Sequence, residues 1–376
     1  MNRTALPGLY VHTPFCKTKC PYCDFYSVTK TARIGEWVGA VLREASRHRD
    51  AFPLFDSLYI GGGTPSVMNH DEIEGLLEGL SDIFHFDDTT ELTMELNPDD
   101  VTKEKLAFYR SLGVNRISLG VQSFNEQEVR FLGRRHTARQ AQAAVSLVAQ
   151  GGFAEFGLDL MYGLPRQSTR TWLQTLRKAL SFGPAHLSCY QLTIEGDTPF
   201  SRLSRGGNLQ LPGEARQGAL FLETSNYLTG AGFIHYEISN FAHAGKECLH
   251  NLNYWRGGEY IGLGAAAASH VNLKRYKNSA DLESYINSPT GIVTESEVLE
   301  PAYKLCEEAM LRLRLVQEGV DIRYLQLKYG CISVASLLER LNRLVEEKLL
   351  TRIDSVYRLH SNRVMIANRV FTEVLV

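Results

Sequence analysis

Three cysteines within eight residues carry the strongest chemical signal in the sequence. Cys16, Cys20 and Cys23 form a CX3CX2C segment, directly after the run YVHTPF. Thiolates spaced this closely can converge on one metal centre if the chain loops around it, as in iron–sulfur binding segments. Zinc is the simpler alternative, but a structural zinc site needs four ligands, and no second Cys or His pair lies nearby. Three ligands therefore favour an iron–sulfur cluster with one open iron.

Other polar residues fall where predicted β-strands end. Glu95 closes the run TMEL, Gln122 follows LGV, and Asp159 lies in LDLMYGLP, while a glycine run, GGGTPS, follows the strand that ends at Ile60. Each polar residue alone would be read as an ordinary loop hydrogen bond, and the glycines alone as a tight turn. At successive strand ends of one sheet, together they predict a single pocket.

The elements that must position these residues alternate between β-type and helical patterns up to about residue 290. The predicted strands are Leu9 to Thr13, Ser57 to Ile60, Glu91 to Leu96, Arg116 to Val121, Phe156 to Met161, His186 to Leu192 and Ile234 to Ile238. The predicted helices are Gly35 to His48, Asp71 to Asp82, Lys103 to Leu112, Ala138 to Ala149, Thr169 to Leu180 and Pro212 to Leu228. Such βαβ repetition builds a parallel sheet, either open and doubly wound or closed fully or partly into a barrel.

A different pattern begins near Leu299. Three helices are predicted at Pro301 to Leu315, Asp321 to Lys328 and Val334 to Glu347, followed by a hairpin at Leu350 to Leu359. This order is that of a winged-helix module. The third helix mixes acidic and basic residues and has no basic recognition face, so a protein-contact or covering role is favoured over DNA binding. We expect two domains, 1–290 with the cofactor sites and 299–376 with the winged-helix-like fold.

Composition describes an ordinary globular protein. The chain has 376 residues, 44% apolar and 22% charged, and 40 Lys and Arg balance 42 Asp and Glu. A net charge of −2 does not recruit nucleic acid or an anionic membrane. No apolar run approaches the ~18 residues of a spanning helix, and no secretory signal precedes Leu9. We expect a cytoplasmic protein without a membrane span. Four cysteines stand alone, and each is expected to be a buried thiol: Cys189, Cys248, Cys306 and Cys331.

The CX3CX2C loop after the first strand of a βα chain resembles the radical S-adenosylmethionine (SAM) superfamily. In that superfamily three cysteines hold a [4Fe-4S] cluster, and the fourth iron takes the amino and carboxylate groups of SAM. The resemblance implies an α/β fold: a partial (β/α) TIM-like barrel of the radical SAM type, here followed by the C-terminal winged-helix-like α+β domain.

The amino-acid sequences of several segments resemble those of the oxygen-independent coproporphyrinogen III oxidase family. The segments are YVHTPFC, GGGTPS, GVQSFN, LGRRH, LDLMYGLP and the tail IANRVF. By that resemblance Glu95 and Asp159 would hold ribose hydroxyl or amino protons of SAM, and Arg134 its carboxylate. The positions that match the family's SAM contacts are Tyr10, Tyr22, Gly62, Gly63, Thr64, Glu95, Gln122, Arg134 and Asp159.

Two subgroups of this family divide on features visible here. The true oxidases resemble CX3CX2CXC and carry a longer N-terminal extension, whereas this chain has Asp24 and Phe25 after Cys23 and only fifteen residues before Cys16. The segment HNLNYW, starting at His250, resembles an element associated with haem binding in the HemW-type haem chaperones. A neutral imidazole can ligate haem iron, and neighbouring aromatic rings can cover the macrocycle.

One departure from the family pattern lies after Gly264. The family usually shows Ala-His-Ser or Ala-His-Gly there, but this chain has Ala268 at the expected His position, with His270 two residues on. This puts a second polar contact at that end of the pocket in doubt.

The sequence thus predicts a haem chaperone that binds haem, a [4Fe-4S] cluster and SAM, and delivers haem to respiratory or other haem proteins. Its partners would be haem and haem-accepting apo-proteins, with peripheral contact to membrane enzymes allowed and no nucleic acid. The alternative is an active coproporphyrinogen III oxidase, so the sequence leaves open whether the chain is an enzyme. A third reading, an iron–sulfur regulator that binds DNA, is weakened by the mixed charge of the C-terminal domain.

Overall fold

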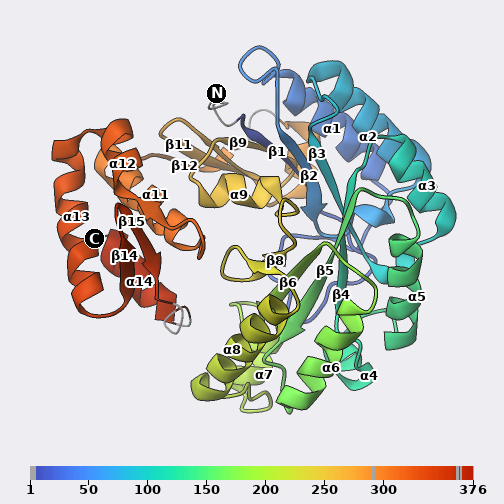
Figure 1. Cartoon of the computed structure of the whole chain (residues 1–376). Helices are drawn as coiled ribbons and strands as arrows, with labels where there is room; N and C mark the ends of the chain where they lie inside the picture. The colour runs from blue at the N-terminus through green and yellow to red at the C-terminus, as the bar shows by residue number, and fades with distance from the viewer. Residues whose placement is uncertain (1–5, 290–292, 361–363, 365, 376) are drawn as a thin grey trace.

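The protein, seen in a computed structural model, is described at residues 6–289, 293–360, 364 and 366–375. In this part of the chain one twelve-stranded sheet has the order β12-β11-β10-β9-β1-β2-β3-β4-β5-β6-β8-β7 (Figure 1). Its strands are β1 (Gly8–Thr13), β2 (Ser57–Gly62), β3 (Glu91–Leu96), β4 (Arg116–Gln122), β5 (Glu155–Tyr162), β6 (His186–Gln191), β7 (Ile234–His235), β8 (Asn240–Ala242), β9 (Tyr260–Leu263), β10 (Ala268–Val271), β11 (Lys274–Asn278) and β12 (Val293–Val298).

Strands β1 to β6 are parallel and lie in chain order, and β9 pairs parallel with the free side of β1. The remaining pairs are antiparallel. The sheet begins at β12 and ends at β7, so the described strands form an open, partial barrel. The predicted α/β class is confirmed, and the barrel is of the partial kind.

Helices connect the parallel strands and lie along one side of them (Figure 1). They are α1 (Ile34–Ser46), α2 (His70–Ile83), α3 (Lys103–Ser111), α4 (Glu126–Phe131), α5 (Ala138–Ala149), α6 (Thr169–Leu180), α7 (Pro199–Arg205), α8 (Glu214–Gly230), α9 (Leu249–Trp255) and α10 (Leu282–Asn287), with 3-10 turns η1 (Pro65–Val67) and η2 (Pro98–Asp100). Side-chain caps fix several of their starts, as where Asn69 accepts a hydrogen bond from the Glu72 amide (2.9 Å) and begins α2.

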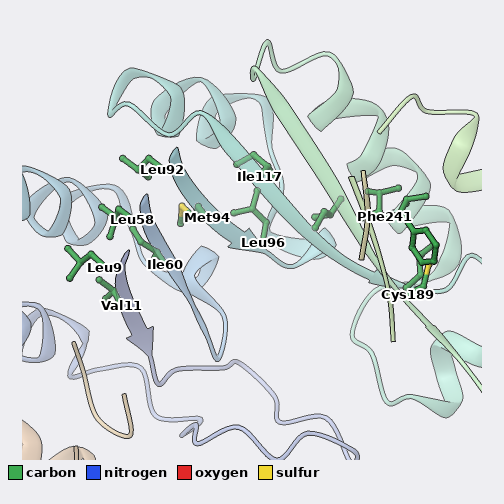
Figure 2. Close-up of a cluster of buried hydrophobic side chains, with 14 of the residues drawn as sticks. Leu9, Val11, Leu58, Ile60, Leu92, Met94, Leu96, Ile117, Cys189 and Phe241 are labelled. Atoms are coloured by element: carbon green, nitrogen blue, oxygen red, sulfur yellow. The ribbon is translucent and has the colours of Figure 1, made fainter. Parts of the chain in front are cut away.

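Alternation along the strands separates an apolar core from a polar interior. Figure 2 shows alternate residues of β1 to β4, such as Leu9, Val11, Leu58 and Ile60, in the buried apolar cluster. Because successive side chains on a strand point to opposite faces, the residues between them face the barrel interior. These interior residues include Tyr10, Tyr59, Glu95, Ser118, Asp159 and Ser188. The same alternation therefore builds the core and collects the polar side chains.

Two parts of the barrel differ from the sequence prediction. The predicted strand Ile234 to Ile238 is wrong in extent, because pairing stops at His235 and resumes in β8, which runs antiparallel to β6. Strands β9 to β12 were not predicted. They extend the sheet past β1 through short antiparallel turns, which interrupt the βα pattern. The proposed boundary at residue 290 lies outside the described residues, and β12 beyond it still belongs to the large sheet.

The C-terminal region has the order of a winged helix. Its elements are α11 (Pro301–Leu313), β13 (Val320–Asp321), α12 (Ile322–Tyr329), α13 (Cys331–Glu346), β14 (Leu350–Ile353), β15 (Val356–Leu359) and α14 (Ala367–Leu375). The three strands form a small antiparallel sheet in the order β13-β15-β14. The predicted three helices and hairpin are confirmed, while β13 and α14 were not predicted.

Three of the four isolated cysteines are buried as predicted, namely Cys189, Cys248 and Cys306. The prediction is wrong for Cys331, which is exposed. It follows Gly330, whose φ of 86° turns the chain at the surface, and the buried face of α13 starts at Val334. Within the described residues, no helix is long and apolar enough to cross a membrane.

Candidate functional site

The three clustered cysteines lie in a loop that leaves the carboxyl end of β1. The backbone closes this loop at its base, where the Cys16 amide donates to the Val28 carbonyl (3.0 Å) and the Val28 amide donates to the Pro14 carbonyl (2.8 Å). A turn inside the loop joins the Cys23 amide to the Cys20 carbonyl (3.1 Å). The chain thus loops back on itself and presents three cysteines within one short segment.

The thiols share one environment and form no disulfide. Cys16 is buried, while Cys20 and Cys23 are half-buried. Burial raises the pKa of Cys23, and the neighbouring Cys20 and Cys16 add to the shift. Among the described residues, no group of three or more His, Cys, Asp or Glu side chains is placed so that it could hold a single metal ion, and the three cysteines are no exception. Three soft sulfur donors in one loop, half-open to solvent, do fit the thiolate ligation of an iron–sulfur cluster.

The glycine run at the end of β2 lies against the cysteine loop. The Gly63 amide donates to the Thr13 carbonyl (2.8 Å), and a Cβ at Gly63 would lie 2.7 Å from the Phe15 carbonyl oxygen. Gly62 has φ +103°, which favours glycine. Thr64 follows, and its hydroxyl lies 3.4 Å from Cys16 Sγ. Glycine is required here because the two backbones touch, so these residues position the first cysteine.

Arg134 joins the cysteine loop to the ends of β3 and β4. Its guanidinium donates to Asn97 Oδ1 (2.8 Å) and to the Gly120 carbonyl (2.9 Å), and it reaches Cys20 Sγ and the Tyr22 hydroxyl, both at 3.4 Å. Its Nε is buried without a partner among the described atoms. A half-buried cation with a spare donor beside a thiol can bind an anionic group.

Two carboxyl groups lie in the barrel interior below this loop. Glu95 accepts hydrogen bonds from the Tyr59 hydroxyl (2.8 Å) and the Gly62 amide (3.2 Å), and Asp159 accepts from the Ser118 hydroxyl (2.9 Å). Burial raises the pKa of Glu95 to about 7, and the nearby charge of Asp159 adds to the shift. Burial also raises the pKa of Asp159. The pair offers hydrogen-bonding oxygens that face inward from β3 and β5, the two strands that flank β4.

Of the remaining predicted SAM positions, Tyr22 and Gln122 lie near the carboxyl ends of the strands, whereas Tyr10 lies in the middle of β1, with its ring centroid 6.2 Å from that of His250. The Tyr10 hydroxyl is hydrogen-bonded to His12 Nδ1 (3.0 Å), and the Tyr22 ring packs near Phe200. Gln122 has φ +65°, a left-handed conformation that is rare for a non-glycine residue, at the point where β4 ends. The structure therefore brings the cysteine loop, the glycine run, Arg134 and the strand-end polar residues together.

His250 lies at the opposite end of the same strands. Its Nδ1 is hydrogen-bonded to the hydroxyl of Ser57, the first residue of β2, at 3.0 Å, and its Nε2 to the Tyr254 hydroxyl at 2.8 Å. The ring stacks on Tyr59, with centroids 5.2 Å apart. Burial lowers the pKa of His250 to about 3, so the imidazole is neutral. The structure does not bring His250 to the cysteines, and both ring nitrogens already have partners.

His270 lies away from the cysteine loop, at the amino ends of β9 and β1. It pairs with Tyr260, the first residue of β9, and its Nδ1 is hydrogen-bonded to the Gly258 carbonyl (3.2 Å). This places it at the amino end of β9, whereas Ala268 is exposed at the start of β10. No side chain near Ala268 replaces the imidazole among the contacts described for these two residues.

Sequence reasoning missed several residues that hold the site. Tyr59 binds Glu95, Asn97 binds Arg134, and Asp100 binds Lys17 of the cysteine loop. The run NPDD directly after β3 was a usable signal, because it follows a strand end as the predicted polar residues do. Glu91 gives no such signal, because it lies at the amino end of β3, away from the strand ends that carry the predicted pocket.

A partial barrel with a three-cysteine loop after its first strand is the arrangement of a radical SAM protein. The sequence model "Radical SAM superfamily" matches residues 10–179. The structure is similar to that of the *Escherichia coli* protein described as "Coproporphyrinogen III oxidase (HemN)", a radical SAM enzyme, with a TM-score of 0.84, 21% identity, and coverage of 98% of this chain and 90% of that one.

Curated relatives are similar over most of the chain. Proteins named "Heme chaperone HemW" are 40% identical in *Escherichia coli*, over 71% of this chain and 70% of that one, and 33% identical in *Lactococcus lactis*, over 97% and 96%. The *Synechocystis* protein of that name is 35% identical over 81% of this chain and 77% of its own length. The chain therefore belongs to the HemW family, within the coproporphyrinogen-oxidase-like branch of the radical SAM superfamily.

Proposed function

We propose that the cysteine loop holds a [4Fe-4S] cluster through Cys16, Cys20 and Cys23. The three thiols, the glycine run that touches their loop, and the half-buried Arg134 beside Cys20 support this assignment. When bound, such a cluster supplies an open iron that can take the amino and carboxylate groups of SAM.

SAM would occupy the space between the cysteine loop and the strand ends. The spare donor of Arg134 would bind its carboxylate, since a guanidinium pairs strongly with that group. Glu95 and Asp159 would accept hydrogen bonds from the ribose hydroxyls or the amino group. The close backbone contact at Gly63 would hold Gly62 and Thr64 beside the methionyl end. The other contacts in this proposal are Tyr10, Tyr22 and Gln122.

The protein as a whole would act as a haem chaperone that carries haem to apo-proteins. The observation that carries this proposal is the similarity to "Heme chaperone HemW" proteins along nearly the whole chain. Two residues agree with it: Phe25 stands where the oxidase pattern has its extra cysteine, and His250 opens the HNLNYW segment. Haem ligation by His250 requires the imidazole to exchange its Tyr254 or Ser57 hydrogen bond for iron.

Oxidation of coproporphyrinogen III is the alternative, favoured by the fold shared with HemN. The two functions separate in an anaerobic assay of reconstituted protein with SAM, a reductant and coproporphyrinogen III. We expect no release of carbon dioxide and no protoporphyrinogen IX. Carbon dioxide release coupled to SAM cleavage would overturn the chaperone proposal in favour of the oxidase.

A further inference from the structure

The cysteine loop is tied to the end of β3 by an ion pair. Lys17, the residue after Cys16, donates from Nζ to Asp100 Oδ1 at 2.5 Å. The Asp100 side chain is fully buried, whereas that of Lys17 is half exposed. A buried carboxylate needs partners, and Asp100 has a second one in the Ser66 hydroxyl, which donates to Oδ2 at 3.0 Å.

This contact continues into a ring of hydrogen bonds that returns to the same loop. The Ser66 hydroxyl accepts a hydrogen bond from the backbone N–H of Asn97 (3.1 Å), and the side-chain Oδ1 of Asn97 accepts one from Arg134 (2.8 Å). Arg134 reaches Cys20 Sγ at 3.4 Å. The ring therefore begins beside Cys16 and ends at Cys20, the two ends of the CX3C segment. Arg135 lies against the same carboxylate, at 3.6 Å from Asp100 Oδ1.

We propose that Asp100 is a positioning residue for the cluster loop: its pair with Lys17, completed by Ser66, Asn97 and Arg134, fixes the spacing of Cys16 and Cys20. This inference rests on the proposed cluster. Because Lys17 is exposed and Asp100 is not, the loop is the part that would move if the pair were broken. A loosened loop would hold its thiolates less well and release iron faster.

The same pair sets the charge beside the cluster. Reduction adds negative charge to the cluster, so a nearby cation favours the reduced state and a nearby anion disfavours it. Lys17 is adjacent to Cys16 in sequence and stays near the cluster even without its partner. Loss of the Asp100 charge should therefore raise the reduction potential, and loss of the Lys17 charge should lower it.

The test compares Asp100→Asn, Lys17→Met and Lys19→Met with wild type in anaerobically reconstituted full-length protein. Lys19 lies in the same loop, is exposed and makes no ion pair with the described residues. Lys19→Met therefore removes a charge from the loop without breaking the Lys17–Asp100 ion pair. The readouts are iron and sulfide per chain, the rate of iron loss to a chelator, and the cluster potential. Circular dichroism checks the fold of each variant.

We expect Asp100→Asn and Lys17→Met to lose iron roughly tenfold faster, as suits the loss of one charge-assisted hydrogen bond, while Lys19→Met behaves as wild type. The potential should rise in Asp100→Asn and fall in Lys17→Met. The proposal would be overturned if Asp100→Asn and Lys17→Met both retained iron as well as Lys19→Met does. It would also be overturned if the cluster potentials of Asp100→Asn and Lys17→Met shifted in the same direction. Wild-type protein that assembles no [4Fe-4S] cluster would instead overturn the cofactor assignment itself.

Discussion

Inward-facing carboxyl groups decide the chemistry of the barrel interior at the scale of single residues. Burial raises the pKa of Glu95 to about 7 and the charge of Asp159 adds to the shift, although the hydrogen bonds from Tyr59 and Gly62 act against it. A cationic ligand that hydrogen-bonds to both carboxyls would relieve their repulsion. The sequence predicted these two residues from positions at strand ends, but only Glu95 lies near one; Asp159 lies inside β5 and faces the interior because side chains alternate along the strand.

Alanine at Glu95 or Asp159 should weaken SAM binding by roughly 1 to 3 kcal/mol, through loss of hydrogen bonds to a charged group, and should leave the cluster in place. Equilibrium dialysis measures the affinity, and iron content checks the cluster. Glu104→Ala, an exposed position on α3, serves as control. If Glu95→Ala and Asp159→Ala both bound SAM with unchanged affinity, these two carboxyl groups would not be part of the SAM site.

His250 was predicted as a haem ligand from its motif, but its setting could not be read from sequence. The ring is enclosed by Ser57 and Tyr59 of β2, which are far from it in sequence, and by Tyr254 of its own helix α9. Burial keeps the imidazole neutral, the form that ligates iron.

His250→Ala should lose or shift the haem absorption band while cluster and SAM binding persist, because the cysteine loop lies at the other end of the strands. His243→Ala, an exposed neighbour, should bind haem as wild type does. Tyr254→Phe removes only the hydroxyl that occupies Nε2 and should not weaken binding. An unaltered haem spectrum in His250→Ala would move the ligand elsewhere.

At the scale of elements, the short helix α9 depends on one carboxylate. Glu91, the first residue of β3, accepts from the amides of Leu249 (3.1 Å) and His250 (3.2 Å) and pairs with Arg116 (3.4 Å). The free amides at a helix start need such an acceptor, and this one fixes the helix that carries His250.

Glu91→Gln should lower the free energy of unfolding by roughly 1 to 3 kcal/mol, because the helix loses its anionic cap and the buried Arg116 loses a partner. Urea unfolding followed by circular dichroism measures the change. The exposed Glu78→Gln on α2 should change stability far less. Equal stability of the two variants would show that Glu91 does not hold α9.

Most strands and helices of the parallel part of the barrel could be predicted from sequence. Strands β9 to β12 could not, because their sequences lack the pattern that marks a buried parallel strand. Helices α5 and α6 match their predicted bounds because their apolar residues recur at helical spacing and Thr137 and Ser168 cap them. Strands β9 to β12 are short or exposed, so they lack the apolar runs of buried parallel strands. Their place in the sheet comes from tertiary pairing, since β9 pairs with β1 and each of β10 to β12 pairs with the strand before it.

At the scale of the whole molecule, burial of acids makes stability depend on pH. Glu44, Glu95 and Glu237 each have a pKa raised to about 7, mainly by burial. A carboxyl with a raised folded pKa binds more protons in the native than in the unfolded state. The contribution of such a carboxyl to the free energy of unfolding is therefore fully present below the ordinary pKa of 4.5, and it is lost as the pH rises through about 7.

Glu44→Gln should accordingly flatten this dependence. Between the ordinary and the raised pKa of Glu44, wild type should lose roughly 1 to 3 kcal/mol of stability relative to the variant as pH increases. A gain in the stability of wild type relative to Glu44→Gln as pH increases would contradict this prediction. Denaturant unfolding at several pH values gives the comparison. The hydrogen bonds from Tyr285 (2.5 Å) and Asn278 (2.7 Å) to Glu44 persist in part with an amide, so the fold should be kept.

The central claim, that the whole protein carries haem, is tested most directly by titrating haem into anaerobically reconstituted wild-type protein and following the Soret absorption. We predict a saturable change that ends at one haem per chain, with the cluster and SAM still bound. A linear, unsaturated rise that matches free haem in buffer would contradict the account, because a haem chaperone must first bind its cargo.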